Sequence, residues 1–142
     1  MLFRSEGVTS APEALERMRQ RRYALVISDL DMEPMDGMAL TRQIRTSPES
    51  ADQFVPIIML SGHTERARVL AARDAGVTEF MTKPFSVQML AQKVQTVIER
   101  PRQFVHTSTY FGPDRRRHSE NFADNERRIL TDKSPEVEVI LG

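Results

Sequence analysis

The sequence predicts an α/β fold in which a doubly wound parallel sheet is built from short apolar strands that alternate with amphipathic helices. Two observations lead to this prediction. Short apolar runs recur at 25–30, 55–60 and 77–81. Each run is followed by a turn and then by apolar residues at helical spacing. This alternation is typical of parallel strands joined by right-handed helical crossovers.

Local signals place the individual elements. Residues 7–9 have the character of the end of a short strand. Ser10 and Glu13 form a capping box, which predicts a helix that runs to about residue 21. The other predicted elements are a strand at 23–28, a helix from Asp36-Gly37, a surface loop at 46–54, a strand at 55–60, a helix from residue 64 or 65 to Ala75 with Gly76 as its stop, a strand at 77–81, and a helix from its cap Ser86 to Pro101.

Composition excludes several classes of protein. The 142 residues suit one domain with additional segments. The formal net charge is zero, which argues against a general nucleic-acid or acidic-membrane binder. Cysteine is absent, so disulfides, thiolate chemistry and cysteine-ligated zinc are excluded. No apolar run approaches the roughly 20 residues of a membrane span, and the N-terminus lacks a signal-peptide core. We therefore expect a cytoplasmic protein.

Three of the predicted strands end in groups that suit phosphoryl chemistry. The strand at 23–28 leads directly into Asp29, the strand at 55–60 leads into Ser61, and the strand at 77–81 is followed by Lys83. Because the carboxyl ends of parallel strands meet at one edge of the sheet, we expect these side chains to lie close together. A carboxylate, a hydroxyl and an ammonium group can together accept and hold a phosphoryl group.

At these residues the chain resembles the CheY-like receiver domain of two-component response regulators. The resemblance rests on Asp29, Met35-Asp36-Gly37, Ser61 and Lys83-Pro84-Phe85, which follow one another in the family's order and spacing. It covers roughly residues 7–100. It implies a flavodoxin-like sheet of strand order 2-1-3-4-5. It also implies that Asp29 accepts a phosphoryl group from a histidine kinase or a phosphotransfer protein in a phosphorelay.

The resemblance assigns roles to the other residues of the pattern. Lys83 would pair with a phosphoryl oxygen, through a loop whose Lys-Pro peptide bond is cis in the family. Ser61 would donate its hydroxyl, and together with Phe80 it would form the family's conformational switch. Mg²⁺ would be held by the carboxylate of Asp29 and by the backbone carbonyl of Asp31.

One part of the family pattern is not found. A receiver begins with a strand that ends in a pair of acids that hold Mg²⁺, and nothing before Ser10 has this pattern. We therefore expect a receiver domain at 1–100 that lacks its first strand, binds Mg²⁺ weakly and is phosphorylated slowly. The simplest interpretation is a fragment or an internal start. The alternative is that the β-prone segment 137–141 fills the gap, in the same chain or by swapping, but we favour a frayed terminus.

From Pro101 onward the sequence becomes polar, and residues 101–142 are expected to form an extended, flexible tail. The tail holds a weak internal echo, in which the run 111–117 recurs at 122–128 with phenylalanine and an arginine pair at the same offsets and an acid between them. We favour a solvated tail over the alternative of two docking elements for an acidic partner.

Two other functions compete. Haloacid-dehalogenase-like phosphatases also carry an Asp-x-Asp motif after an apolar strand, as in Asp29-Leu30-Asp31, but Glu33 departs from their pattern. A degenerate receiver would dock partners without phosphorylation. We favour a single-domain response regulator that signals by protein contact and is not an enzyme in the usual sense. Neither nucleic acid nor membrane is an expected partner, and a homodimer is left open.

Overall fold

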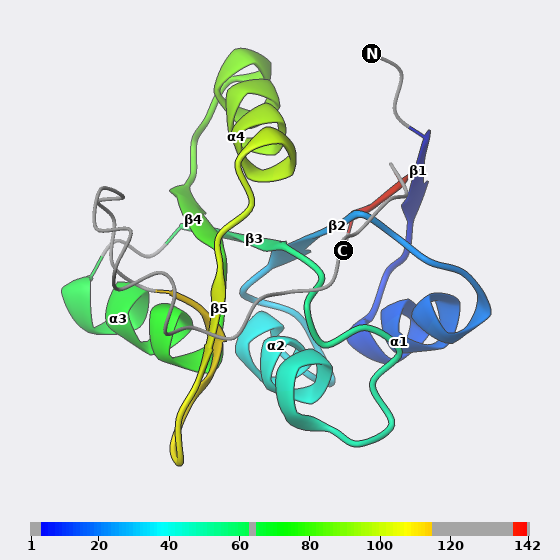
Figure 1. The fold of residues 1–142 in the computed structure, drawn as a ribbon. Coiled ribbons are helices and arrows are strands. Elements are labelled where there is room, and N and C mark those ends of the chain that lie inside the picture. Colours follow the sequence, from blue (N-terminus) through cyan, green and yellow to red (C-terminus); the bar gives the residue numbers. More distant parts are fainter. Residues whose placement is uncertain (1–3, 63–64, 115–137, 142) are drawn as a thin grey trace.

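The computed structural model describes residues 4–62, 65–114 and 138–141 (Figure 1). Its main sheet has the order β1-β7-β2-β3-β4, and every neighbouring pair is parallel. These strands are β1 (Arg4–Gly7), β7 (Glu138–Leu141), β2 (Leu25–Asp29), β3 (Ile57–Ser61) and β4 (Glu79–Thr82). The remaining elements are α1 (Ala11–Gln20), α2 (Gly37–Thr46), α3 (Arg66–Ala75), α4 (Val87–Glu99), β5 (Phe104–His106) and β6 (Phe111–Pro113). The predicted α/β architecture is confirmed.

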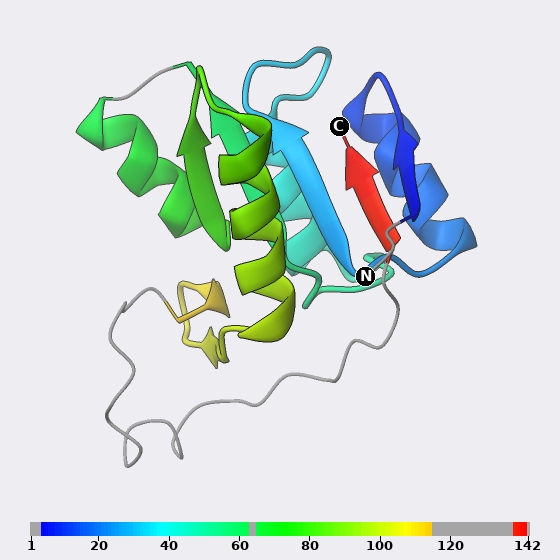
Figure 2. The same cartoon turned by 90° about the horizontal axis from the view of Figure 1, so that it is seen from above.

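Helices cover both faces of the sheet, as the doubly wound prediction requires. Helices α1, α2 and α3 lie against one face, and α4 lies against the other (Figures 1 and 2). Alternate residues of each strand face opposite layers, so Val26 belongs to the core on the α1 and α2 side, whereas Leu25 and Ile27 belong to the core under α4. The strand carrying Asp29 is thus buried on both faces, which fixes the position of its carboxyl end.

The predicted helix boundaries follow from local chemistry. Ser10, Asp36 and Ser86 each accept a hydrogen bond from the backbone N–H three residues further on, which satisfies one free donor of the first helical turn. Gly76 ends α3 in the left-handed conformation, with φ of 111°, which a glycine adopts without strain. The predicted caps at Ser10 and Ser86 and the predicted stop at Gly76 are confirmed.

The position beside β2 that seemed vacant from the sequence is occupied by β7. This strand pairs with β1 in the register Arg4 to Glu138 and with β2 in the register Ile27 to Leu141. The interpretation of this segment as a frayed terminus is therefore wrong for residues 138–141. The physical reason is that two parallel strands with an open position between them leave backbone donors and acceptors unpaired, and a β-prone segment satisfies them.

The segment after α4 also differs from the expected flexible tail. Residues 104–113 form an antiparallel hairpin of β5 and β6. Phe104 and Phe111 pack against Phe54, with ring centroids 5.2 and 5.5 Å from its ring. This aromatic cluster supplies the apolar contact that holds a short hairpin in place. The second copy of the internal echo, at 122–128, lies outside the described residues.

A buried arginine connects α2 to the hairpin and to the loops beneath the sheet. Arg45 is 1% exposed and donates hydrogen bonds to the carbonyl oxygens of Gly76, Gln53 and Val55, at 2.9, 2.8 and 2.7 Å. Its guanidinium carbon lies 4.8 Å from the ring centre of Phe104. Burial lowers the pKa of Arg45 to about 9. The buried charge of Arg45 is therefore satisfied by groups that come from distant parts of the chain.

Candidate functional site

Asp29 and Lys83 meet at the carboxyl edge of the sheet. Asp29 is the last residue of β2, and Lys83 directly follows the end of β4. The Nζ atom of Lys83 lies 2.7 Å from Oδ1 of Asp29. Both side chains remain partly open to solvent, at 44% and 35% exposure. The Lys83–Pro84 peptide bond is cis, as the family resemblance implies.

Ser61 lies between these two residues in the sheet. It is the last residue of β3, the strand between β2 and β4. The backbone N–H of Lys83 donates to the carbonyl oxygen of Ser61 at 2.8 Å, so the end of β3 positions the lysine loop. Ser61 is itself fully buried. The three residues that the sequence singled out therefore come from adjacent strand ends.

The Met-Asp-Gly turn explains how α2 approaches Asp29 closely. Asp36 caps the helix by accepting from the N–H of Ala39 at 2.8 Å. Gly37 donates its own N–H to the carbonyl of Leu30 at 2.9 Å. A Cβ atom at Gly37 would overlap the carbonyl oxygen of Asp29 and would lie 2.6 Å from Sδ of Met59. Only glycine lets the helix begin this close to the acceptor strand.

Phe80 lies on β4, opposite Met59 of β3 in the ladder. It is half-buried and packs against the small cluster of Leu30, Met59, Ala72 and Val77. An aromatic ring in this setting has both a packed side and an accessible side. The predicted switch role of Phe80 therefore stays a prediction.

The described residues do not complete a magnesium site. They contain no group of three potential metal ligands among His, Cys, Asp and Glu. Asp31 is exposed in the loop after β2. The ladder pairs Leu141 with Ile27, so the described part of β7 stops short of the level of Asp29. In this part of the chain, Asp29 thus has no accompanying acid from its neighbouring strand.

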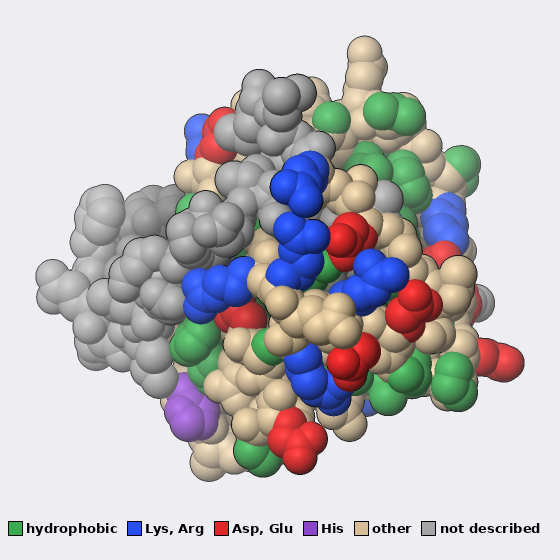
Figure 3. All heavy atoms as spheres, turned by 90° about the vertical axis from the view of Figure 1, so that its right-hand side faces the viewer, with side chains coloured by type: hydrophobic (Ala, Val, Ile, Leu, Met, Phe, Trp, Pro, Cys, Tyr) green, Lys and Arg blue, Asp and Glu red, His purple; other side chains and the backbone are tan. Residues whose placement is uncertain are grey.

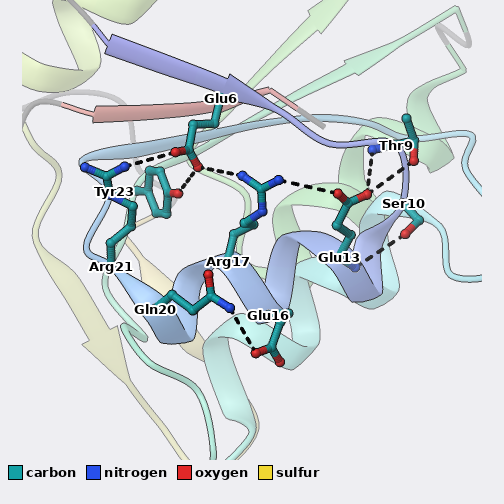
Figure 4. A network of polar contacts seen from close by, with 9 residues as sticks. All are labelled: Glu6, Thr9, Ser10, Glu13, Glu16, Arg17, Gln20, Arg21 and Tyr23. Carbon is teal, nitrogen blue, oxygen red and sulfur yellow. Dashed lines mark hydrogen bonds and ion pairs between the residues drawn. The ribbon is translucent and has the colours of Figure 1, made fainter.

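Sequence reasoning missed a second polar cluster, which is centred on Glu6 of β1 (Figure 4). Glu6 accepts from Arg17 and Arg21, at 3.1 and 3.0 Å, and from the hydroxyl of Tyr23. The Tyr23 hydrogen bond is the main reason that the pKa of Glu6 is lowered. Burial and the neighbouring Glu6 raise the pKa of Tyr23 to about 12. The sequence signal was weak, because the acid and its partners lie on different elements.

The surface around this cluster carries both signs of charge. Figure 3 shows basic and acidic side chains next to one another on the face where α1 and β1 lie. Arg17 pairs with both Glu6 and Glu13, and Arg19 pairs with Glu16. Charges paired in this way are worth little stability each.

Comparison with protein families identifies the class of protein. Residues 2–95 match the family model described as the response regulator receiver domain. The chain therefore belongs to this family, which is a family of signalling domains and not of classical enzymes. This match decides between the receiver and the haloacid-dehalogenase-like phosphatase in favour of the receiver.

Two curated relatives illustrate the range of the family. The chain is 28% identical over 105 residues to chemotaxis protein CheY of Pseudomonas aeruginosa, a match that covers 70% of this chain and 83% of that protein. It is 32% identical over 113 residues to transcriptional regulatory protein CseB of Streptomyces avermitilis, covering 78% of this chain. The match spans only 43% of CseB.

Solved structures agree with the assignment. A response regulator receiver protein from Pseudomonas putida is 34% identical with a TM-score of 0.56, and the match covers 64% of this chain and 74% of that one. The receiver domain of the sensor histidine kinase PA1611 of Pseudomonas aeruginosa is 27% identical with a TM-score of 0.57, covering 65% and 74%. That receiver holds a magnesium ion in its active site cleft. In the described part of our chain, no helix is long and apolar enough to cross a membrane.

Proposed function

We propose that this receiver accepts a phosphoryl group on Asp29 and signals by protein contact. The observation that carries the proposal is the 2.7 Å contact between Lys83 Nζ and Asp29 Oδ1 at the carboxyl edge of the sheet. Asp29 supplies a nucleophile that is partly open to solvent, and Lys83 supplies a positive charge at the place where negative charge would accumulate.

In the proposed reaction a carboxylate oxygen of Asp29 attacks the phosphorus atom of a phosphohistidine. The new bond joins that oxygen to phosphorus, the phosphorus–nitrogen bond breaks, and its electron pair returns to the imidazole ring. The product is an acyl phosphate on Asp29. Lys83 then pairs with a phosphoryl oxygen, and Ser61 donates its hydroxyl to another. Movement of Ser61 toward the phosphoryl group would free space for the ring of Phe80, which forms the switch.

Mg²⁺ binding in this chain is proposed to be weak. The described residues offer the carboxylate of Asp29 and the backbone carbonyl of Asp31, which leaves most of an octahedral shell to water. A magnesium ion in such a shell would supply charge neutralisation. Because the donor set is incomplete, slow phosphorylation is the expected consequence.

The proposed partners are a histidine kinase or a phosphotransfer protein upstream and an unidentified protein downstream. Receiver domains occur in separate settings among the relatives, including a chemotaxis protein and a transcriptional regulator.

The second candidate is a docking module that works without phosphorylation, and the incomplete magnesium donor set favours it. Intact mass after incubation with a small phosphodonor and Mg²⁺ distinguishes the two, with Asp29→Asn as the control. One added phosphoryl group that is absent in the variant supports an active receiver. No addition at any Mg²⁺ concentration would contradict phosphorylation and favour the docking module.

A further inference from the structure

The β5–β6 hairpin lies outside residues 2–95, which match the family model, but it is tied to the strand of the predicted switch. In Figure 2 the hairpin lies below the start of β4, at the end of the sheet opposite to the edge that carries Asp29. Arg102, just before β5, donates to the carboxylate of Glu79 on β4 at 2.9 Å and to the carbonyl oxygen of Asp114, just after β6, at 3.0 Å. One side chain therefore joins the start and the end of the hairpin to β4.

Glu79 makes this connection firm, because its carboxylate is largely withdrawn from solvent. Its side chain is 9% exposed, and it also accepts from Lys93 of α4 at 3.2 Å. Removing one cationic partner from a buried carboxylate is strongly destabilising. We therefore expect Arg102 and β4 to move together.

A cavity of ≈ 50 Å³ lies between β4, α3 and the end of the hairpin. Phe80 borders this cavity from β4, and Pro113 and Asp114 border it from the hairpin. Ser61 lies two residues beyond Met59, the ladder partner of Phe80, and so on the side away from the hairpin. Movement of the Phe80 ring toward Ser61 would enlarge the cavity, and the walls of an enlarged cavity lose packing contacts. The hairpin wall would then lose its neighbour on β4.

The base of the hairpin is the part that such a change would release. Among the described residues, Gln103 Oε1 is buried at this base and has no hydrogen-bond partner. A buried oxygen of this kind costs free energy that is regained when it reaches water. The backbone carbonyl of Gln103 accepts from the N–H of Asp114 at 2.7 Å, which closes the base. The rest of the hairpin is held separately, through the contacts of Phe104 and Phe111 with Phe54.

We propose that the hairpin is a regulatory clasp on β4, closed while Phe80 borders the cavity and opened at its base when the ring moves toward Ser61. This inference rests on the proposed function, because phosphorylation of Asp29 is what moves the ring. Phosphorylation at one end of the sheet thereby changes the surface at the other end. Coupling between two sites is reciprocal, so a protein that binds the opened base would stabilise the phosphorylated state.

The role of the Phe80 ring can be tested without phosphorylation, by hydrogen exchange at the amide of Asp114 in the full chain. Phe80→Leu enlarges the cavity and is expected to speed this exchange roughly threefold or more. The matched control is Phe85→Leu, the same change on the α4 side of the sheet, which should leave Asp114 unchanged. The amide of Val26, which donates to Pro56, corrects both variants for a general loss of stability. Equal exchange at Asp114 in the two variants would overturn the clasp.

The second measurement is made on the phosphorylated chain, with a small phosphodonor and Mg²⁺ in excess and the added phosphoryl group confirmed by intact mass. Phosphorylation is expected to speed exchange at Asp114 roughly threefold or more and to leave the amide of Thr107, at the tip of the hairpin, unchanged. Phe80→Leu has no ring to move and should show no further increase. A phosphorylated chain with unchanged exchange at Asp114 would overturn the clasp and leave the proposed function standing.

Arg102→Gln removes the bridge between the hairpin and β4, and Arg100→Gln, at an exposed position, is its control. Arg102→Gln is expected to give fast exchange at Asp114 with and without phosphorylation, whereas Arg100→Gln should keep the difference between the two states. The same response in both variants would overturn the clasp. If intact mass shows no added phosphoryl group, the proposed function fails, and the comparison of Phe80→Leu with Phe85→Leu accepts or rejects the clasp by itself.

Discussion

The ammonium group of Lys83 lies 2.7 Å from the carboxylate of Asp29, although 54 residues separate them in the chain. The two residues come from strands that are not neighbours in the sheet. The lysine follows β4 and the aspartate ends β2, with β3 between them, and the backbone N–H of Lys83 is fixed by the carbonyl of Ser61. The order of strands in the sheet therefore creates the charge pair.

Lys83→Gln tests whether this pair serves function more than stability. Both side chains are partly exposed, and ion pairs open to solvent are worth at most about 1 kcal/mol. We expect the free energy of unfolding in urea to change by less than about 1 kcal/mol. Phosphorylation by a small phosphodonor should slow by roughly 10- to 100-fold, because the charge that stabilises the transferred group is lost. A normal phosphorylation rate in a folded variant would contradict the proposed role of Lys83.

Gly37→Ala is expected to destabilise the domain. The added methyl group would overlap the carbonyl oxygen of Asp29 and crowd Met59, so the start of α2 must move away from β2. Overpacking of this kind costs about 1–3 kcal/mol in urea unfolding. Gly62→Ala is the matched control, since nothing lies within 4 Å of a Cβ atom there. Equal stability of the two variants would show that α2 can adjust freely.

Local signals were sufficient to predict the helix caps, the helix stop and the strand ends that meet at one edge of the sheet. Ser10, Ser86 and Gly76 act on the next few residues of the chain, so their effect can be read directly from sequence. The placement of β7 could not be read in this way. Parallel pairing of Glu138 with Arg4 joins segments more than 100 residues apart and leaves no local pattern.

The buried role of Arg45 was also beyond local inference. An arginine in the last turn of a helix normally faces water, and its positive charge interacts favourably with the negative end of the helix dipole. Here Gly76, the loop carbonyls and the ring of Phe104 surround it, and these come from separate parts of the chain. The burial of this side chain depends in part on the β5–β6 hairpin, and the sequence had predicted only a flexible tail there.

Arg45→Met should therefore be strongly destabilising. Methionine fills part of the space but leaves the carbonyl oxygens of Gly76, Gln53 and Val55 without this donor. We expect a loss of about 3 kcal/mol or more in urea unfolding. Arg42→Met on the exposed side of the same helix is the control and should stay within about 0.5 kcal/mol. Similar values for both variants would show that the buried hydrogen bonds contribute little.

Glu79 of β4 should make stability depend on acid pH. Burial alone would raise the pKa of Glu79, but the hydrogen bond from Arg102 and the charge of Lys93 outweigh it, and the pKa is lowered. A carboxyl group whose pKa is lower in the folded state than in the unfolded state stabilises the folded state at every pH above its unfolded pKa. That contribution is lost as the pH falls through the lowered folded pKa.

Glu79→Gln should accordingly make the free energy of unfolding depend less on pH in the acid range. We expect the free energy of unfolding of the unmodified protein to fall between about pH 5 and pH 3, and that of the variant to fall less steeply. Glu49→Gln, at an exposed loop position, should reproduce the unmodified curve. Because Arg102 also donates to the carbonyl of Asp114, the loss at low pH should extend to the end of the hairpin. Faster amide exchange at Asp114, whose N–H donates to Gln103, would report this release, and parallel acid limbs for all three proteins would refute it.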